Sequence, residues 1–165
     1  MSGIGALAHG NDIGGSLRFP AAANGAVTVK PGLGRIPAWN STQKIERGML
    51  AQSMSVQGLL TRSVGDLDLA MPAIVLSDAH DPFHVPLEYR LGSADGPLRV
   101  AFCMETPGFD THPDVTKALQ NAADALKDAG YQVEEKNIPF LEETGNCGFR
   151  ALMGEVSVMM GKDIR

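Results

Sequence analysis

A single stretch of the chain decides its fold class: residues 98–139, LRVAFCMETPGFDTHPDVTKALQNAADALKDAGYQVEEKNIP. It opens with a strand-like run at 98–103, after which apolar residues recur at helical spacing through residues 115–129. Gly130 stands where a helix end favours glycine, and an extended pattern resumes at 131–135. Strand, helix and strand in this order predict a βαβ unit with two parallel strands, and therefore an α/β fold.

The length and composition limit the class of protein further. The chain has 165 residues, enough for one domain with a single hydrophobic core. Hydrophobic residues make up 44% and charged residues 20%, as in ordinary globular proteins rather than disordered ones. The 14 basic and 19 acidic residues give a net charge of -5, and no cluster of Lys and Arg forms a basic stripe. Nucleic acid is therefore not an expected partner.

Membrane, metal and secretion signals are missing from the sequence pattern. The longest apolar stretch, residues 69–76, contains Pro72 and is far shorter than the ~20 residues of a membrane-spanning helix, so no span is expected. Cys103 and Cys147 lie in no CxxC or histidine-rich spacing, so neither a metal nor another cofactor is expected. Because no basic residue precedes Arg18, a signal peptide is not indicated, and the cytoplasm is the expected compartment.

Shorter structural signals occupy the rest of the chain. Residues 1–10 are predicted to form the end of a helix or a turn, followed by a short buried strand. The β-branched alternation at 26–30 predicts a strand that stops at Pro31. Three prolines without hydrophobic periodicity predict a surface loop over 77–97. After Leu141 the pattern weakens, and no element is assigned there.

Two helix entries can be located from capping residues. Ser63 is a candidate cap with Asp66 three residues later, as in a capping box, and Pro72 is expected to end or bend that helix. The helix within residues 98–139 is expected to begin at Thr111 or His112.

The residues that suggest chemistry lie at 10–20, GNDIGGSLRFP, where a hydroxyl directly follows two glycines. Residues without Cβ let successive backbone N–H groups converge on one negative charge, and Ser16 would present its Oγ beside them. Acyl transfer needs both parts, a nucleophile and an oxyanion hole. On spacing alone a plain turn is the favoured interpretation of the Gly-Gly-Ser run, because loops are rich in glycine and serine. A phosphate-binding loop is disfavoured because GxxxxGK[ST] does not occur.

A longer string of residues is more specific. Residues 10–21 are followed by a Lys-Pro pair at 30–31, a Gly-Arg pair at 34–35, and the segment GLLTRSVGD at 58–66. Together they resemble the signature of the amidase signature family of serine hydrolases, and the resemblance covers about residues 5–140. It implies an α/β/α fold with a mixed β-sheet flanked by helices.

The resemblance also implies a domain organisation and a site. Residues 1–165 would form a single partial amidase domain, with the signature segment at about 5–40 and the βαβ unit at about 98–139. Ser16 matches the nucleophile, whereas Asp12 and Arg18 would brace its loop. The oxyanion of the acyl-transfer step would be held by backbone N–H groups of Ile13, Gly14, Gly15 and Ser16. The implied partner is a small-molecule amide substrate.

One departure from the family pattern concerns the proton-transfer groups. Family members pair the nucleophile with a cis-serine and a lysine that lie upstream, and the 15 residues before Ser16 contain neither motif. Lys30 matches the structural Lys-Pro pair, and Lys44 is expected to be a surface residue. The chain is therefore expected to be an internal segment of an amidase that is inactive by itself. Because no GxSxG elbow occurs, four histidines are assigned structural or surface roles: His9, His80, His84 and His112.

Three functional hypotheses remain. The first is an amidase that hydrolyses a carboxamide C–N bond through a Ser16 acyl-enzyme. The second is a non-catalytic α/β fragment or interaction domain, and the third is an amidotransferase A-type subunit. The third is disfavoured because Phe19 replaces the glutamine common in those subunits. Exposed strand edges are expected in a partial sheet, so a homo-oligomer is a further expectation.

Overall fold

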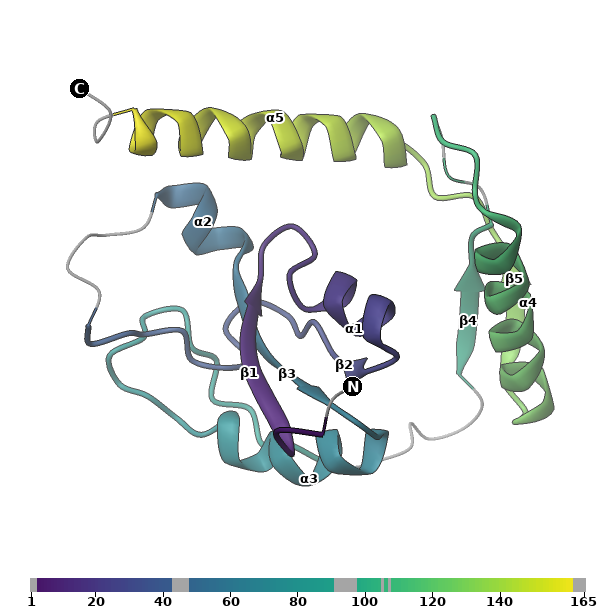
Figure 1. The fold of residues 1–165 in the computed structure, drawn as a ribbon, viewed down its shortest axis with the longest axis horizontal. Helices are drawn as coiled ribbons and strands as arrows, with labels where there is room; N and C mark the ends of the chain where they lie inside the picture. Colours follow the sequence, from purple (N-terminus) through teal and green to yellow (C-terminus); the bar gives the residue numbers. More distant parts are fainter. Residues whose placement is uncertain (1–2, 43–47, 91–97, 105, 107, 162–165) are drawn as a thin grey trace. The chain divides into compact units, whose positions relative to one another are not determined.

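The computed structural model describes residues 3–42, 48–90, 98–104, 106 and 108–161. The chain divides into two compact units: Met1–Leu91 with Glu155–Arg165, and Gly92–Gly154. Both units contain strands and helices, so the fold is α/β, as the sequence predicts (Figure 1).

The first unit contains a three-stranded antiparallel sheet. Its strands are β1 (Leu7–Asp12), β2 (Val27–Thr28) and β3 (Val56–Thr61), in the spatial order β1-β3-β2. The central strand β3 is buried at every residue except Leu60. In the β1–β3 register, Gly10 lies directly opposite Gly58.

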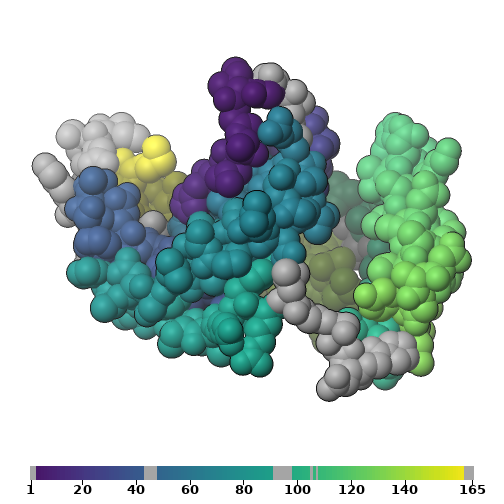
Figure 2. Space-filling model, turned by 90° about the horizontal axis from the view of Figure 1, so that it is seen from below, coloured from purple at the N-terminus to yellow at the C-terminus, as the bar shows by residue number. Residues whose placement is uncertain are grey.

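The strand expected near the N-terminus is present, but it is not buried. Only Asp12 of β1 is buried, because β1 is an edge strand of this sheet. Leu7, its first residue, is 48% exposed, and Ile4, three residues before the strand, is 93% exposed. Figure 2 shows this N-terminal segment, in purple, at the surface beside atoms coloured for β3 and α3. The expectation of a buried strand was therefore wrong.

The helix α3 (Val64–Ile74) begins where the capping pattern predicts. The Oγ of Ser63 accepts a hydrogen bond from the Asp66 amide at 3.1 Å and donates one to the Asp66 carboxylate at 2.8 Å. Pro72 lies in the last turn of the helix, which ends two residues later. Met71 of this helix and Val75, which follows its last residue, pack with Ile36 in one hydrophobic cluster of the unit.

The segment at 77–90 contains no helix or strand, as predicted, but it is attached to the unit at several points. The amide of Val85 donates to the Gly34 carbonyl at 2.8 Å, and the Arg35 guanidinium donates to the carbonyls of Leu87 and Glu88. Gly34 has a φ of +77°, and a Cβ there would lie against the backbone of Phe83. The prediction for 91–97 concerns residues outside the described ones.

The second unit contains the strand–helix–strand segment. Strands β4 (Arg99–Phe102) and β5 (Gln132–Glu135) pair in parallel, and α4 (Pro113–Asp128) connects them. The helix begins after His112, whose Nδ1 accepts from the Asp114 amide at 3.2 Å. At its other end, Gly130 adopts a φ of +89°. Local capping residues therefore set both ends of α4, where the sequence pattern places them.

Three helices were not expected, the first of which is α1 (Arg18–Asn24), after β1. The helix α2 (Met49–Met54) precedes β3, and α5 (Leu141–Met160) is the longest helix of the described chain, with 20 residues. Three glycines lie within α5 and reduce its helix propensity, which is why the pattern after Leu141 is weak. Part of its stabilisation comes from a tertiary contact, since Glu155 accepts hydrogen bonds from the amides of Leu50 and Ala51 on α2 at 2.8 and 2.9 Å.

Candidate active site

The candidate nucleophile Ser16 lies in the short connection between β1 and α1 (Arg18–Asn24) (Figure 1). Exposed and buried residues alternate along this connection. Gly14 and Ser16 are exposed to solvent, whereas Gly15 and Leu17 are buried. The loop therefore presents the hydroxyl-bearing residue outward between two residues that are held against the protein.

The buried carboxylate of Asp12 organises the loop. Its Oδ1 accepts from the Gly15 amide at 2.8 Å, and its Oδ2 accepts from the amides of Leu17 and Arg18 at 3.2 and 3.3 Å. The side chain is fully buried. One acidic side chain at the end of β1 thus holds three backbone amides on either side of Ser16 and caps the first turn of α1 from outside the helix.

Arg18 completes the arrangement around this carboxylate. Its Nη2 donates to Oδ1 of Asp12 at 2.9 Å and its Nε donates to Oδ2 at 3.0 Å, a bidentate pair. The Arg18 guanidinium, together with the backbone amides, holds the pKa of Asp12 far below its usual range, although burial acts in the opposite direction. The same contact raises the pKa of Arg18. The sequence resemblance assigned these two residues a bracing role, and they do contact each other here.

Gly15 has a backbone conformation that other residues rarely adopt. Its φ is +124°, and a Cβ would lie 2.3 Å from Cε2 of Phe19. Its carbonyl accepts from the Phe19 amide at 2.7 Å, so both polar groups of Gly15 are bonded. Gly14, in contrast, has no atom within 4 Å of an added Cβ. Gly15 is therefore required by its backbone conformation, whereas a side chain at position 14 would find open space.

The four backbone amides expected to hold an oxyanion differ in whether they already donate a hydrogen bond. The Gly15 amide is already donated to Asp12. Within the described part of the chain, no hydrogen-bond acceptor is found for the amides of Ile13, Gly14 and Ser16. Three amides next to the hydroxyl are thus available to a ligand.

Leu17 attaches the loop to the sheet, and the sequence reasoning missed this contact. Its side chain is fully buried and lies over Gly10 and Gly58, which we call the glycine pair. A Cβ on Gly58 would lie 2.5 Å from Cδ1 of Leu17, and a Cβ on Gly10 would lie 3.2 Å from Cδ2. Glycine inside a strand often marks such a close approach, so this signal was present in the sequence.

A base for Ser16 is not found among the described residues. Lys30 is exposed after β2, and Lys44 lies outside the described residues. No hydrogen bond joins Ser16 to a histidine in the described part of the chain; His80 pairs with Asp78 at 2.8 Å, and the buried Nε2 of His84 has no partner there. No three His, Cys, Asp or Glu side chains come together as metal ligands within these residues.

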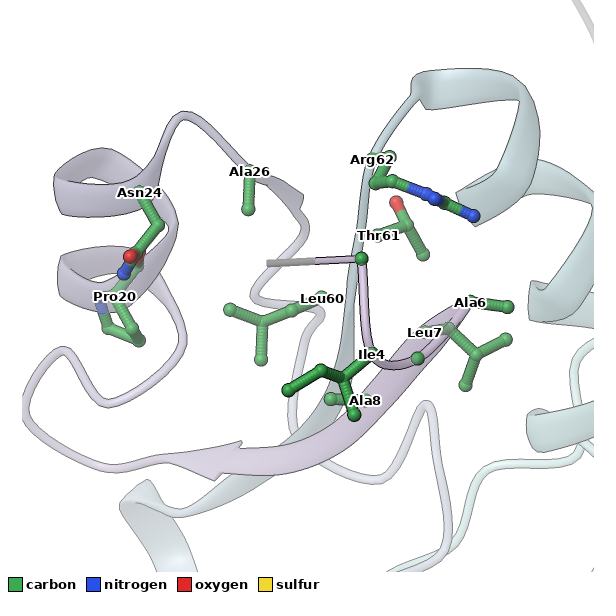
Figure 3. A pocket seen from close by; sticks show the side chains of 12 residues that line it. Ile4, Ala6, Leu7, Ala8, Pro20, Asn24, Ala26, Leu60, Thr61 and Arg62 are labelled. Atoms are coloured by element: carbon green, nitrogen blue, oxygen red, sulfur yellow. The ribbon is translucent and has the colours of Figure 1, made fainter. Parts of the chain in front are cut away.

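A hollow of about 290 Å³ is lined by residues of β1, α1 and β3. Figure 3 shows Pro20 and Asn24 of α1 across it from Ile4 and Leu60. Ser16 does not line this hollow. This hollow is therefore not the place where the Ser16 hydroxyl would meet a substrate.

An α/β fold in which an exposed serine follows two glycines is compatible with the class of serine hydrolases, although a fold alone does not define an activity. Comparison with known families defines the class. The model of the amidase family matches residues 2–163, so this chain belongs to the amidase family. The resemblance to the amidase signature family is thereby confirmed.

Three comparisons describe its relatives. The indoleacetamide hydrolase of Bradyrhizobium japonicum is 44% identical over 158 residues, covering 96% of this chain and 34% of the relative. The A-type subunit of the glutamyl-tRNA(Gln) amidotransferase of Staphylococcus aureus is 34% identical over 143 residues, covering 84% of this chain and 28% of the relative. The structure of 6-aminohexanoate cyclic dimer hydrolase superimposes with a TM-score of 0.68 and 29% identity, covering 82% of this chain and 30% of that chain.

The chain thus spans about a third of the length of these relatives. Among the described residues, no helix is long and apolar enough to cross a membrane.

Proposed function

We propose that this chain carries the nucleophile segment of an amidase, with Ser16 as the nucleophile. The observation that carries the proposal is the exposed Ser16 between Gly15 and Leu17, whose amides are both donated to the buried carboxylate of Asp12. A nucleophile must stay accessible while its backbone stays fixed, and this arrangement meets both demands.

The proposed reaction is hydrolysis of a carboxamide in two steps. In the first step, Oγ of Ser16 attacks the carbonyl carbon, the C–N bond breaks, and the amine or ammonia leaves with the proton of the hydroxyl. In the second step, water attacks the ester so formed, the acid is released, and Ser16 regains its proton. The amides of Ile13, Gly14 and Ser16 would stabilise the negative oxygen in both steps. The Gly15 amide would hold Asp12 rather than the oxyanion.

Proton transfer requires a base that we expect from other parts of a full-length amidase. The resemblance assigns this role to a lysine acting through a cis-serine, and a lysine can serve as a base when burial lowers its pKa. We therefore expect the 165-residue chain to hydrolyse amides only when those groups are supplied.

The proposed substrate is an arylacetamide. This proposal is supported by the 44% identity to an indoleacetamide hydrolase, a protein whose name states its substrate. We further propose the cytoplasm as the compartment, no nucleic-acid partner, and association of copies through the free edge of β1, whose residues are largely exposed.

A role as an amidotransferase A-type subunit is the competing proposal, supported by the 34% identity to such a protein. Phe19, which replaces the glutamine common in those subunits, weighs against it. Phe19 is 73% exposed next to the nucleophile loop, so it changes the surface that a substrate or partner would meet.

The test uses the chain and a chimera. The 158 matching residues of the Bradyrhizobium japonicum indoleacetamide hydrolase are replaced by this chain, so that the relative supplies the proton-transfer groups. Ammonia release from indoleacetamide and labelling by a fluorophosphonate, followed by intact mass, are measured for the chimera and for the chain alone. We expect ammonia release and one adduct in the chimera, both lost in Ser16→Ala.

Ser16→Ala in the chimera is the matched control, since it removes only one oxygen atom. A chimera that folds, as judged by circular dichroism, but neither hydrolyses the amide nor reacts with the probe would contradict the amidase proposal. The non-catalytic hypothesis would then stand. Hydrolysis by the chain alone would contradict only the expected need for further groups.

A further inference from the structure

The geometry points to Gly10 and Gly58 as positioning residues for the nucleophile. This inference rests on Ser16 being the nucleophile, as proposed above. The glycine pair lies on neighbouring strands, opposite each other in the β1–β3 register, and neither residue belongs to the loop that bears the hydroxyl. We propose that the pair sets the height of Ser16 above the sheet through the side chain of Leu17.

The first step of the argument is the contact itself. The two methyl groups of Leu17 lie on a part of the sheet that has no side chains, one over each glycine. An added Cβ would lie 2.5 Å from Cδ1 at position 58 and 3.2 Å from Cδ2 at position 10. Because buried side chains pack at contact distance, any atom added under Leu17 must displace it.

The second step concerns how a displacement would reach Ser16. Leu17 is the next residue along the chain, and its amide is held by Oδ2 of Asp12 at 3.2 Å. The side chain is thus fixed to the sheet and the backbone to Asp12, with Ser16 between Leu17 and the equally fixed Gly15. Because Leu17 is fully buried, a shift that rotation of its side chain does not absorb must move the Ser16 backbone or break the contact with Asp12.

The third step distinguishes the two glycines. Among the described residues, Leu17 alone would lie within 3.4 Å of a Cβ at position 10, and the next contact is Leu60 at 3.7 Å. At position 58 a Cβ would also lie 2.9 Å from the carbonyl of Val29. Gly10→Ala therefore tests the Leu17 contact alone, and Gly58→Ala is the stronger but less selective change.

The experiment uses two readouts. One is hydrogen exchange, in the full 165-residue chain, of the amides that contact Asp12, those of Gly15, Leu17 and Arg18. The other is the rate at which a fluorophosphonate labels Ser16 in the chimera described above, which supplies the proton-transfer groups. A role in general stability alone would alter exchange throughout β3, whereas positioning alters the loop amides first.

We expect Gly10→Ala to accelerate exchange of the three loop amides and to slow labelling. The double variant Gly10→Ala/Leu17→Val, which removes the methyl groups that the new Cβ meets, is expected to recover both. For Gly58→Ala, where Leu17 must move by roughly 1 Å, the labelling rate is expected to fall about 10²-fold. Gly5→Ala is the control, because a Cβ there has only an ordinary contact at 3.6 Å.

Each outcome decides one claim. Unchanged exchange and labelling in folded Gly10→Ala, or no recovery in the double variant, would overturn the positioning role. If the unmodified chimera is not labelled, Ser16 is not an activated nucleophile and the amidase proposal fails, whereas the exchange data on the chain still decide whether the glycine pair holds the loop. If Gly58→Ala does not fold, the milder Gly10→Ala and its recovery carry the test.

Discussion

Arg18 meets both oxygens of the Asp12 carboxylate, with Nη2 2.9 Å from Oδ1 and Nε 3.0 Å from Oδ2. The carboxylate is fully buried, whereas the Arg18 side chain is 54% exposed. The two partners therefore differ in exposure: the loop encloses Asp12, and Arg18 covers the carboxylate from the solvent side. The three backbone amides on Asp12 make the carboxylate the centre of the nucleophile loop.

Replacing Asp12 by Asn is expected to lower the free energy of unfolding by about 2–3 kcal/mol. The amide group of Asn would place a donor where backbone N–H groups now donate. Since Arg18 is half exposed, water screens its share of the loss, which comes mainly from the buried amides. Urea unfolding measures the change. The exposed Asp110→Asn is the control, and an equal effect of both substitutions would contradict the role of Asp12.

The stabilisation by Asp12 is expected to depend on pH with a definite sign. Its pKa in the folded chain lies below the ordinary value of 3.8, so the unfolded chain binds the proton first on acidification. The contribution is thus fully present well above pH 3.8 and is lost as the pH falls below it. The difference in unfolding free energy between the unmodified chain and Asp12→Asn should shrink in acid. A difference that stays constant would show that ionisation of Asp12 is not involved.

Gly15→Ala is expected to destabilise the chain by about 1–3 kcal/mol, because a φ of +124° is strained for any residue with a Cβ. Contact with the Phe19 ring adds to the cost, although that ring can rotate. Gly14→Ala is the matched variant, since an added Cβ there has open space. Thermal unfolding of both variants provides the measurement. Equal melting temperatures would refute the conformational requirement at Gly15.

Glu155→Ala is expected to cost about 1–2 kcal/mol, because it removes the acceptor of two amides in the first turn of α2. The loss of stability should be confined to the start of α2. Hydrogen exchange at Leu50 and Ala51 should accelerate more than exchange in β3. Glu155→Gln keeps one acceptor and is expected to have a smaller effect, and Glu143→Ala, an exposed residue at the start of α5, should leave these amides unchanged. Unaltered protection in Glu155→Ala would refute the contact.

Several elements could be predicted because their signals are local. Ser63 and Asp66 mark the start of α3 within four consecutive residues, and His112 and Gly130 mark the ends of α4. The family could also be recognised, since the signature residues at 10–66 follow one another at the family's spacing along the chain. The burial of β1 could not be predicted, because it depends on the position of the strand at an edge of the sheet.

The sequence by itself determined the α/β class, the capped helices and membership of the amidase family, because each is read from the order and spacing of residues along the chain. Only the tertiary structure decided that Gly58 lies opposite Gly10 under Leu17, that the Gly15 amide is committed to Asp12, and that Glu155 caps a helix 105 positions away. These contacts depend on how distant segments approach in space. Periodicity and spacing describe residues that are close along the chain, so they do not specify which distant strand or helix end a residue contacts.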